Sequence, residues 1–486
     1  MQQSKLIRLL SSLSAAEARR FESFVQSPYH NTLDKAVALV QYLLAFYPDF
    51  SSPALEAELI SERIFGSSAE SLQPLHDLSS HLTRLLEQFW AIEQIKSNPK
   101  ELQYQLSEAL LSPERMWHHN KIWEKGRKTG EPEEKDAGYW LREYKYWEQG
   151  MRQAQQLKKR QTKDFLDSRL EMTMASLDRF YLIQKLVLCC EAINRSKILN
   201  TEFAPELLQE VSHYLTSSKS ELSQVPLIQL YFQVLTLLQA ANDEEYRKLL
   251  DLLVIHQDHI SRNTGFALYT YAQNHCIRQI NQGRSAFLDE LFLLYKTLLQ
   301  RAYLLEEDGS LAHWHYKNIT TVALRLKEFD WVSIFLEEYR DKLSAELRES
   351  VYTYNLAALH YEQGAYKSAL KLLQQTDFTD VYYALSAKSM LLKIYYELED
   401  EEALGYAIQA FDVYLRRNQE ISKDHFLIHK NLLRFTKKIH RFRIRYASLS
   451  ASEQKSRAAK LEAELNSASS VANLSWLQAK LADISS

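Results

Sequence analysis

The sequence predicts an all-α protein in which a small N-terminal helical domain precedes a right-handed α-solenoid of helical hairpins. One supporting observation is that the 486 residues include only 10 glycines and 9 prolines, whereas average usage would give about 34 and about 24. Folds rich in tight turns need both residues, and long helices joined by short polar turns do not. The other observation is that candidate two-helix units follow one another from about residue 175. Their starts lie about 35–48 residues apart, which is the range of helical-hairpin repeats.

Charge and cysteine content narrow the expected environment. The 59 Lys and Arg residues nearly balance the 62 Asp and Glu residues, and the formal net charge is −3. This balance argues against a chain that coats nucleic acid or a membrane with its whole surface. The three cysteines, two of them adjacent, provide no disulfide framework, and the amphipathic N-terminus lacks the apolar core of a signal peptide. We therefore expect a cytoplasmic protein without a membrane span.

Residues 1–97 form the predicted N-terminal helical domain. Apolar residues recur at helical spacing through Leu39, Leu43 and Phe46, and again from Leu78 to Phe89. Seven of the nine prolines fall within residues 28–132 and none follows Pro226. This shift in composition marks at least two regions, and the residue before a proline disfavours helical backbone, so breaks are expected at Ser27-Pro28, Tyr47-Pro48 and Ser52-Pro53.

Residues 98–175 are predicted to form two long helices around a mobile loop at 126–138, which contains three glycines, a proline and charges of both signs. The segment 139–149 then interleaves aromatic residues with two cations, a combination that suits single-stranded nucleic acid. Its aromatic spacing is also that of a buried helical stripe, and we favour this second interpretation; the stripe consists of Trp140, Tyr144 and Trp147.

Residues 176–449 are predicted to form the helical repeats, and residues 450–486 a pair of capping helices. A hairpin repeat cannot bury its apolar face alone, so neighbouring repeats complete its core and a terminal cap closes the array. The last segment suits a cap because it has one apolar stripe opposite a polar face, and the stripe consists of Leu474, Leu477, Leu481 and Ile484.

The segment 354–374 resembles a tetratricopeptide repeat. It has the leucine, the small residues, the turn glycine and the turn aromatic of that family, at Leu356, Ala357, Gly364, Tyr366 and Ala369. Glycine suits the turn because it adopts positive φ readily. A partial match lies 37 residues upstream, with Ile319, Thr320, Phe329 and Val332 in the same roles and Lys327 in place of the glycine. The match 35 residues downstream needs a one-residue deletion in the turn.

The resemblance covers about 200–300 residues and specifies a fold more than an activity. The N-terminal segments SPYHN and FYPDF also resemble those of uncharacterised bacterial helical-repeat proteins.

The resemblance implies a concave groove that binds a peptide or protein partner. The residues expected to face this groove combine tyrosines with cations, which suits a partner with an acidic end; they are Lys317, Thr321, Arg325, Tyr354, Tyr361, Lys393 and Tyr396. The asparagines that clamp a C-terminal carboxylate in some members of the family are missing. Thr321, Ala358 and Lys393 occupy those positions.

An alternative partner site is the basic segment 430–445, which has seven cations and no acidic residue. Its cations are Lys430, Arg434, Lys437, Lys438, Arg441, Arg443 and Arg445. Such a helix suits nucleic acid or another anionic partner. The more ordinary interpretation is a repeat helix with a solvated basic edge, which the acidic run at 397–402 could neutralise.

The sequence contains no pattern that predicts catalysis. The motifs GxGxxG, GxxxxGK[ST] and GxSxG are all absent. The pairs His256/His259 and His425/His429 have helical metal-ligand spacing, but no further ligand completes either set. We therefore expect no catalytic, cofactor-binding or metal-binding residues and no cofactor. The expected function is a non-catalytic cytosolic protein–protein interaction scaffold; the alternative is a nucleic-acid-associated or regulatory protein that uses the basic segment.

Overall fold

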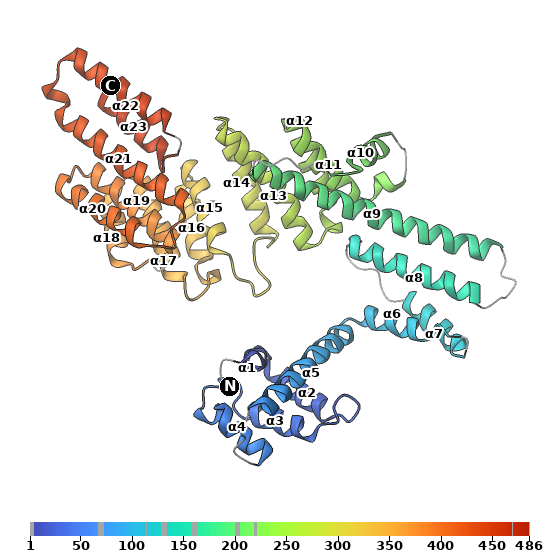
Figure 1. Ribbon diagram of the computed structural model, residues 1–486. Coiled ribbons are helices and arrows are strands. Elements are labelled where there is room, and N and C mark those ends of the chain that lie inside the picture. The colour runs from blue at the N-terminus through green and yellow to red at the C-terminus, as the bar shows by residue number, and fades with distance from the viewer. Residues whose placement is uncertain are drawn as a thin grey trace. The chain divides into compact units, whose positions relative to one another are not determined.

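The computed structural model describes residues 4–66, 72–112, 114–127, 134–156, 163–199, 205–217, 221–378, 380–468 and 470–485 (Figure 1). In these ranges the chain forms 23 α-helices, five short 3-10 helices and no sheet. The prediction of an all-α protein is therefore confirmed. The chain divides into two compact units, one of residues 1–132 and 137–180 and the other of residues 133–136 and 181–486.

The first unit begins with five helices around one apolar core: α1 (Lys5–Leu10), α2 (Ala15–Gln26), α3 (Asp34–Leu44), α4 (Ala57–Phe65) and α5 (Gln73–Ser97). A capping box fixes the start of α2, because the Ser14 N–H donates to Glu17 Oε2 at 2.8 Å and the Glu17 N–H donates to Ser14 Oγ at 3.3 Å. The predicted apolar spacing from Leu78 to Phe89 corresponds to the buried face of α5.

The rest of the first unit consists of α6 (Pro99–Ala109), α7 (Met116–Arg127), α8 (Ala137–Gln156) and the first part of α9 (Lys163–Leu199). The sequence suggests two long helices over residues 98–175, whereas the structure has shorter helices before α9. In the sequence, Pro113 follows Ser112 between α6 and α7, and the residue before a proline disfavours helical backbone. Of the predicted loop at 126–138, residues 128–133 lie outside the described residues, and α8 already begins at Ala137.

The second unit starts within α9 and continues as a series of helices, which from residue 226 onward contact one another in sequence order. They are α10 (Leu208–Ser217), α11 (Pro226–Ala240), α12 (Asp243–Ile255), α13 (Arg262–Asn281), α14 (Phe287–Gln300), α15 (His313–Arg325), α16 (Phe329–Glu338), α17 (Arg348–Glu362), α18 (Tyr366–Gln375), α19 (Val381–Glu397), α20 (Glu401–Arg417), α21 (Lys423–Arg445), α22 (Ala451–Ser467) and α23 (Leu474–Ser485). Besides these neighbours, α15 contacts α17 and α17 contacts α19.

Three helix pairs share one turn geometry. The turns after α15, α17 and α19 each place one residue at positive φ: Lys327 at 60°, Gly364 at 76° and Glu399 at 58°. In each of these turns, the N–H of the residue that follows the positive-φ residue donates to the carbonyl five residues before it. The three N···O distances are 3.0, 2.8 and 3.1 Å, and this hydrogen bond is typical of a Schellman motif. The one-residue deletion expected in the third turn is wrong, because Glu399 lies 35 residues after Gly364 in the same conformation and the buried Leu404 occupies the position of Ala369.

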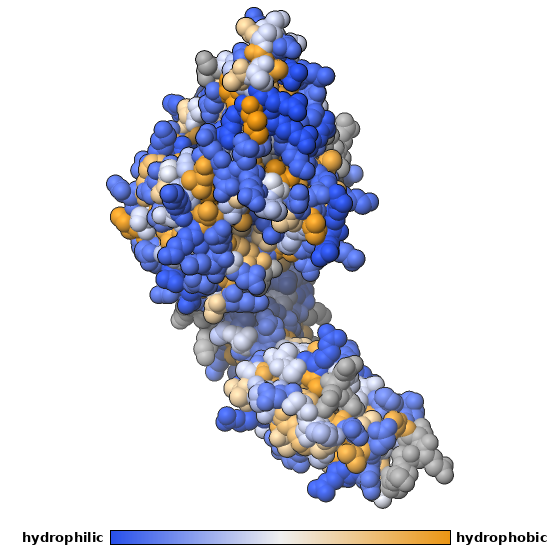
Figure 2. Space-filling view, turned by 90° about the vertical axis from the view of Figure 1, so that its left-hand side faces the viewer, coloured by the Kyte–Doolittle hydropathy of each residue, from blue (hydrophilic) through white to orange (hydrophobic). Residues whose placement is uncertain are grey.

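The last three helices close a core that extends back to α19. Leu477 and Leu481 of α23 are buried in it, and Leu474 and Ile484 pack against it. The apolar stripe predicted for the end of the chain therefore faces the core, as a capping helix requires. Figure 2 shows one face of the molecule, on which hydrophobic residues form small separate patches among hydrophilic ones. In the described part of the chain, no helix is long and apolar enough to cross a membrane.

Candidate functional site

The predicted groove residues on α15 and α17 meet residues of α19. The Lys317 ammonium donates to Ser386 Oγ at 2.7 Å, and its Nζ lies 5.1 and 5.0 Å from the ring centroids of Tyr354 and Tyr383. The Tyr383 hydroxyl in turn donates to the His313 carbonyl at 3.0 Å. These contacts therefore join α15 to α19, although α16, α17 and α18 lie between them in the chain. Side chains of α17 and α19 therefore contact the Lys317 ammonium group.

Lys393 forms a second cation–tyrosine contact on the same helices. Its Nζ lies 4.2 Å from the ring centroid of Tyr361, which is 8% exposed. Burial lowers the pKa of Lys393, while the nearby carboxylates of Glu362 and Glu397 raise it. Burial also lowers the pKa of Lys317 and raises the pKa of Tyr354 to about 12.

The other three predicted groove residues have different surroundings. Thr321 and Arg325 are exposed on α15. Tyr396 is only 3% exposed and belongs to the C-terminal core, where its ring lies edge-on to Trp476 at 5.3 Å and beneath the Arg443 guanidinium at 4.4 Å. The structure thus pairs Lys317 with Tyr354 and Lys393 with Tyr361, and it separates Tyr396 from both pairs.

Lys317 and Lys393 share one electrostatic property. Both are half-buried, and neither forms an ion pair with a carboxylate of the described residues at 4.0 Å or less. Removal of a charge from water is unfavourable unless another charge or hydrogen bonds compensate it. The tyrosine rings compensate in part, since a cation over an aromatic face gains about 0.5–2 kcal/mol. The ammonium groups keep donor capacity for a further acceptor, because each has three N–H bonds.

The basic segment 430–445 lies in α21, and acidic residues neutralise much of its charge. Lys430 forms an ion pair with Asp412, and Lys438 forms one with Glu464. Arg434 lies 3.9 Å from Glu464, and Arg443 lies 3.5 Å from Glu399. Only the last of these acids belongs to the run 397–402 that the sequence suggested as a neutralising group. The remaining cations, Lys437, Arg441 and Arg445, are exposed.

The structure adds two cations that the sequence analysis did not select. Arg457 and Lys460 of α22 line a surface pocket of about 250 Å³ together with Lys438, Arg441 and Arg445 of α21. A search for pairs of cationic residues at i and i+3 on the final helices could have found Arg457 and Lys460. Their proximity to α21 could not be predicted without knowing how the two helices pack.

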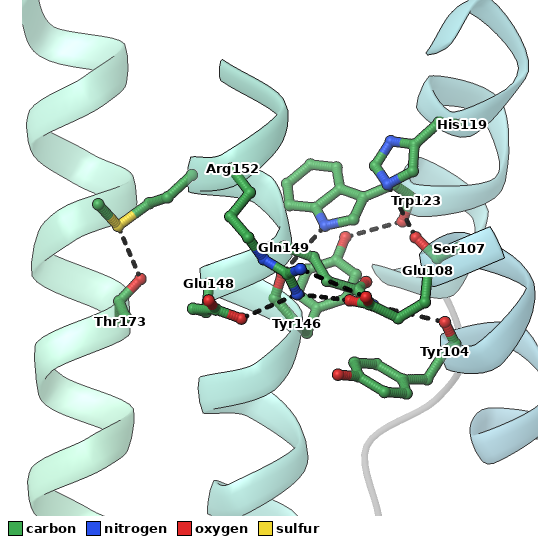
Figure 3. Close-up of polar contacts among 11 residues, drawn as sticks. Tyr104, Ser107, Glu108, His119, Trp123, Tyr146, Glu148, Gln149, Arg152 and Thr173 are labelled. Carbon is green, nitrogen blue, oxygen red and sulfur yellow. Dashed lines mark hydrogen bonds and ion pairs between the residues drawn. The ribbon is translucent and has the colours of Figure 1, made fainter. Parts of the chain in front are cut away.

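A cluster of polar contacts joins α6, α7, α8 and α9 in the first unit (Figure 3). Glu108 of α6 accepts hydrogen bonds from Gln149 and Arg152 of α8, both at 2.5 Å. Between α7 and α8, Trp123 Nε1 donates to the Tyr146 carbonyl at 3.2 Å, and the Tyr146 hydroxyl donates to the Trp123 carbonyl at 2.8 Å. These contacts fix the register of the helices.

The same cluster contains a serine–histidine pair. Ser107 Oγ lies 2.9 Å from His119 Nε2 (Figure 3). A catalytic pair of this kind needs a third group to orient the histidine and space for a substrate. His119 Nδ1 has no hydrogen-bond partner in the described ranges, and Ser107 and His119 are 3% and 0% exposed. The pair is therefore a structural contact between α6 and α7.

The aromatic stripe predicted at Trp140, Tyr144 and Trp147 lies on α8 and is half-buried.

Comparisons with protein-family models, curated proteins and solved structures find no match to this chain. Among the residues that the structure describes, no group of three or more His, Cys, Asp and Glu side chains is placed to hold a metal ion. His256 Nε2 lies 2.6 Å from Gln229 Oε1, and His429 Nδ1 lies 2.7 Å from the His425 carbonyl. All three cysteines are free and buried.

Proposed function

We propose that this chain is a non-catalytic, cytoplasmic interaction scaffold that binds an acidic segment of a peptide or protein partner. In this proposal, α11 to α20 are tetratricopeptide-like hairpins of a right-handed α-solenoid, and the partner lies along α15, α17 and α19. The supporting observation is that two half-buried lysines, Lys317 and Lys393, are held over tyrosine rings and that, within the described residues, neither has a carboxylate oxygen within 4.0 Å.

The choice of an acidic partner follows from the energetics of these two lysines. Each ammonium has lost part of its hydration, which lowers its pKa. A carboxylate of the partner would replace the lost hydration with a charge-assisted hydrogen bond. Thr321 and Arg325, which are exposed on α15, would extend the same surface. Since Ser386 occupies one donor of Lys317, we expect the partner to accept from the remaining N–H bonds of this ammonium group.

The regular helix pairing supports this assignment to a scaffold. The three equivalent turns at Lys327, Gly364 and Glu399 recur after 37 and 35 residues, and α15, α17 and α19 contact one another in order. Because each pair packs on the next, the lysines are carried by a continuous apolar framework rather than by a loop. A rigid framework lowers the entropy that is lost when a partner binds.

Nucleic-acid association through α21 is the alternative proposal. It has less support, since Lys430, Lys438 and Arg443 already have intramolecular carboxylate partners. Phosphate contacts release counterions, so this alternative predicts a steep loss of affinity with added salt. A peptide complex with two ion pairs would be less sensitive to salt.

The proposal is tested with three fluorescent peptides of equal length, one acidic, one neutral and one basic, in anisotropy titrations of the full chain. We expect the acidic peptide to bind at least about tenfold more tightly than the neutral one, a difference of about 1.4 kcal/mol, and the basic peptide not to bind. Equal affinities for the three peptides, or no binding of the acidic one, would contradict the proposal.

A further inference from the structure

We propose that the pocket between α21 and α22 is a binding site for a compact polyanion with two or more phosphate groups, such as a diphosphate. The pocket has a volume of about 250 Å³, and eight residues line it: Lys438, Arg441, Phe442, Arg445, Arg457, Lys460, Leu461 and Glu464. This inference does not depend on the proposed peptide site, because it involves other residues and another ligand.

The two helices contribute matching faces to the pocket. On α21, the lining residues are 438, 441, 442 and 445, and on α22 they are 457, 460, 461 and 464. Both sets follow the spacing i, i+3, i+4 and i+7, which places four side chains on one helix face. Phe442 is buried and Leu461 is half-buried, so the base of the pocket is apolar. The cations surround this base.

The charges of the pocket are not balanced. Five cations line it with one carboxylate, Glu464, and that carboxylate already forms an ion pair with Lys438 and lies 3.9 Å from Arg434. Within the described ranges, no carboxylate lies within 4.0 Å of the cationic groups of Arg441, Arg445, Arg457 or Lys460. The Glu453 carboxylate, one helical turn before Arg457, accepts hydrogen bonds from the Ser450 N–H and hydroxyl at 3.0 and 2.7 Å.

Such an arrangement is unfavourable in the absence of a ligand, because like charges within a few ångströms repel one another. A ligand with several negative charges would convert this repulsion into attraction. Three of the four uncompensated cations are arginines, whose planar guanidinium groups bind phosphate oxygens in a bidentate manner. Guanidinium groups pair with carboxylates in the same manner, so it is the four uncompensated positive charges of one small pocket that favour a compact ligand with several negative charges, such as a diphosphate.

The size of the pocket and the charges around it favour a compact ligand over a nucleic-acid strand. Pockets for drug-sized molecules have volumes of about 300–1,000 Å³, and this one is smaller. A strand would need a row of free cations along α21, but two cations of this helix that do not line the pocket, Lys430 and Arg443, are within ion-pair distance of Asp412 and Glu399. The uncompensated charge is thus concentrated at the pocket.

The test is isothermal titration calorimetry of the full chain with pyrophosphate, orthophosphate and a single-stranded oligonucleotide. The pocket variant is Arg441→Gln with Arg457→Gln. The control variant is Lys437→Gln with Lys455→Gln, which removes two exposed charges from the same two helices outside the pocket. We expect pyrophosphate to bind the wild type at least about tenfold more tightly than orthophosphate. The pocket variant should lose at least about tenfold in pyrophosphate affinity, and the control variant less than about twofold.

Three results would overturn the proposal: no binding of pyrophosphate, an equal loss of affinity in both variants, or tighter binding of the oligonucleotide with a similar loss in the control variant. The last would identify a general strand-binding surface. Circular dichroism checks that both variants fold. If the pocket variant Arg441→Gln with Arg457→Gln does not fold, Lys460→Gln alone replaces it. Failure of the acidic peptide to bind leaves this prediction unchanged.

Discussion

The buried side chain of His275 predicts that acid destabilises the protein. Its ring is 0% exposed and stacks on Tyr246 at 5.0 Å, and within the described residues neither ring nitrogen has a hydrogen-bond partner. Burial, with a smaller contribution from Arg278, lowers the pKa of His275 to about 4, compared with about 6.5 in an unfolded chain. The unfolded state therefore binds more protons between these two pH values, and the free energy of unfolding falls as the pH decreases through them.

We predict that His275→Phe removes this part of the acid sensitivity. The full effect of the pKa difference is about 3 kcal/mol, at about 1.4 kcal/mol for each pH unit. Melting temperatures of the wild type and the variant should therefore differ more at pH 4.5 than at pH 7.5, in favour of the variant. A difference that does not change with pH would show that protonation of His275 does not limit the stability.

Lys327 carries backbone strain that glycine avoids in the equivalent turn. Its φ is 60° and that of Gly364 is 76°, and a side chain at positive φ costs about 1 kcal/mol. We predict that Lys327→Gly raises the free energy of unfolding by about 0.5–1 kcal/mol, whereas Gly364→Ala lowers it by about 1 kcal/mol. A Cβ at Gly364 would meet no atom within 4 Å, so the second change tests the backbone alone. Urea titration measures both, and changes of the same sign would contradict this explanation.

At the scale of elements, α23 connects the end of the chain to α19. The Glu397 carboxylate of α19 accepts hydrogen bonds from Trp476 Nε1 at 3.0 Å and from Lys480 at 3.1 Å. On the same helix, Leu477 is 0% exposed in the C-terminal core. These contacts give α23 both an apolar and a polar attachment, as expected of a helix that closes an array.

We predict that Leu477→Ala destabilises the C-terminal core by about 2–5 kcal/mol, the usual cost of such a cavity. The matched control is Gln478→Ala, which changes an exposed side chain of the same helix and should have almost no effect. Limited proteolysis should therefore cleave the Leu477 variant faster between α21 and α23. Equal cleavage rates in the two variants would show that α23 does not close this core.

At the scale of the whole molecule, the sequence predicted the features that depend on short-range pattern. The glycine and proline deficit predicted an all-α chain, and the spacing after residue 175 predicted paired helices. The apolar stripe of the last segment identified the core-facing side of α23. The separation of α6 from α7 was not predicted, although Pro113 signals a break in the sequence. The resemblance places Lys327 at the position of the turn glycine, and the structure shows that Lys327 and Glu399 both adopt positive φ there without a glycine.

The candidate sites depend on distances that the sequence does not contain. The resemblance to tetratricopeptide repeats assigns Lys317, Tyr354 and Lys393 to one groove, but it does not predict the hydrogen bond between Lys317 and Ser386, 69 residues away. It also grouped Tyr396 with the groove, whereas the packing of α23 places this ring in the C-terminal core. The phosphate pocket requires α21 to lie against α22, so Arg457 and Lys460 gained a role only in the folded chain.

The measurement that tests the central claim most directly is the affinity of the acidic peptide for two matched double variants. Lys317→Gln with Lys393→Gln removes the two half-buried cations, and Lys367→Gln with Lys371→Gln removes two exposed cations of α18. We expect the first variant to bind the peptide at least about tenfold more weakly than the wild type. The second should bind within about twofold of the wild type. Equal affinities of the two variants would contradict the assignment of α15, α17 and α19 as the partner site.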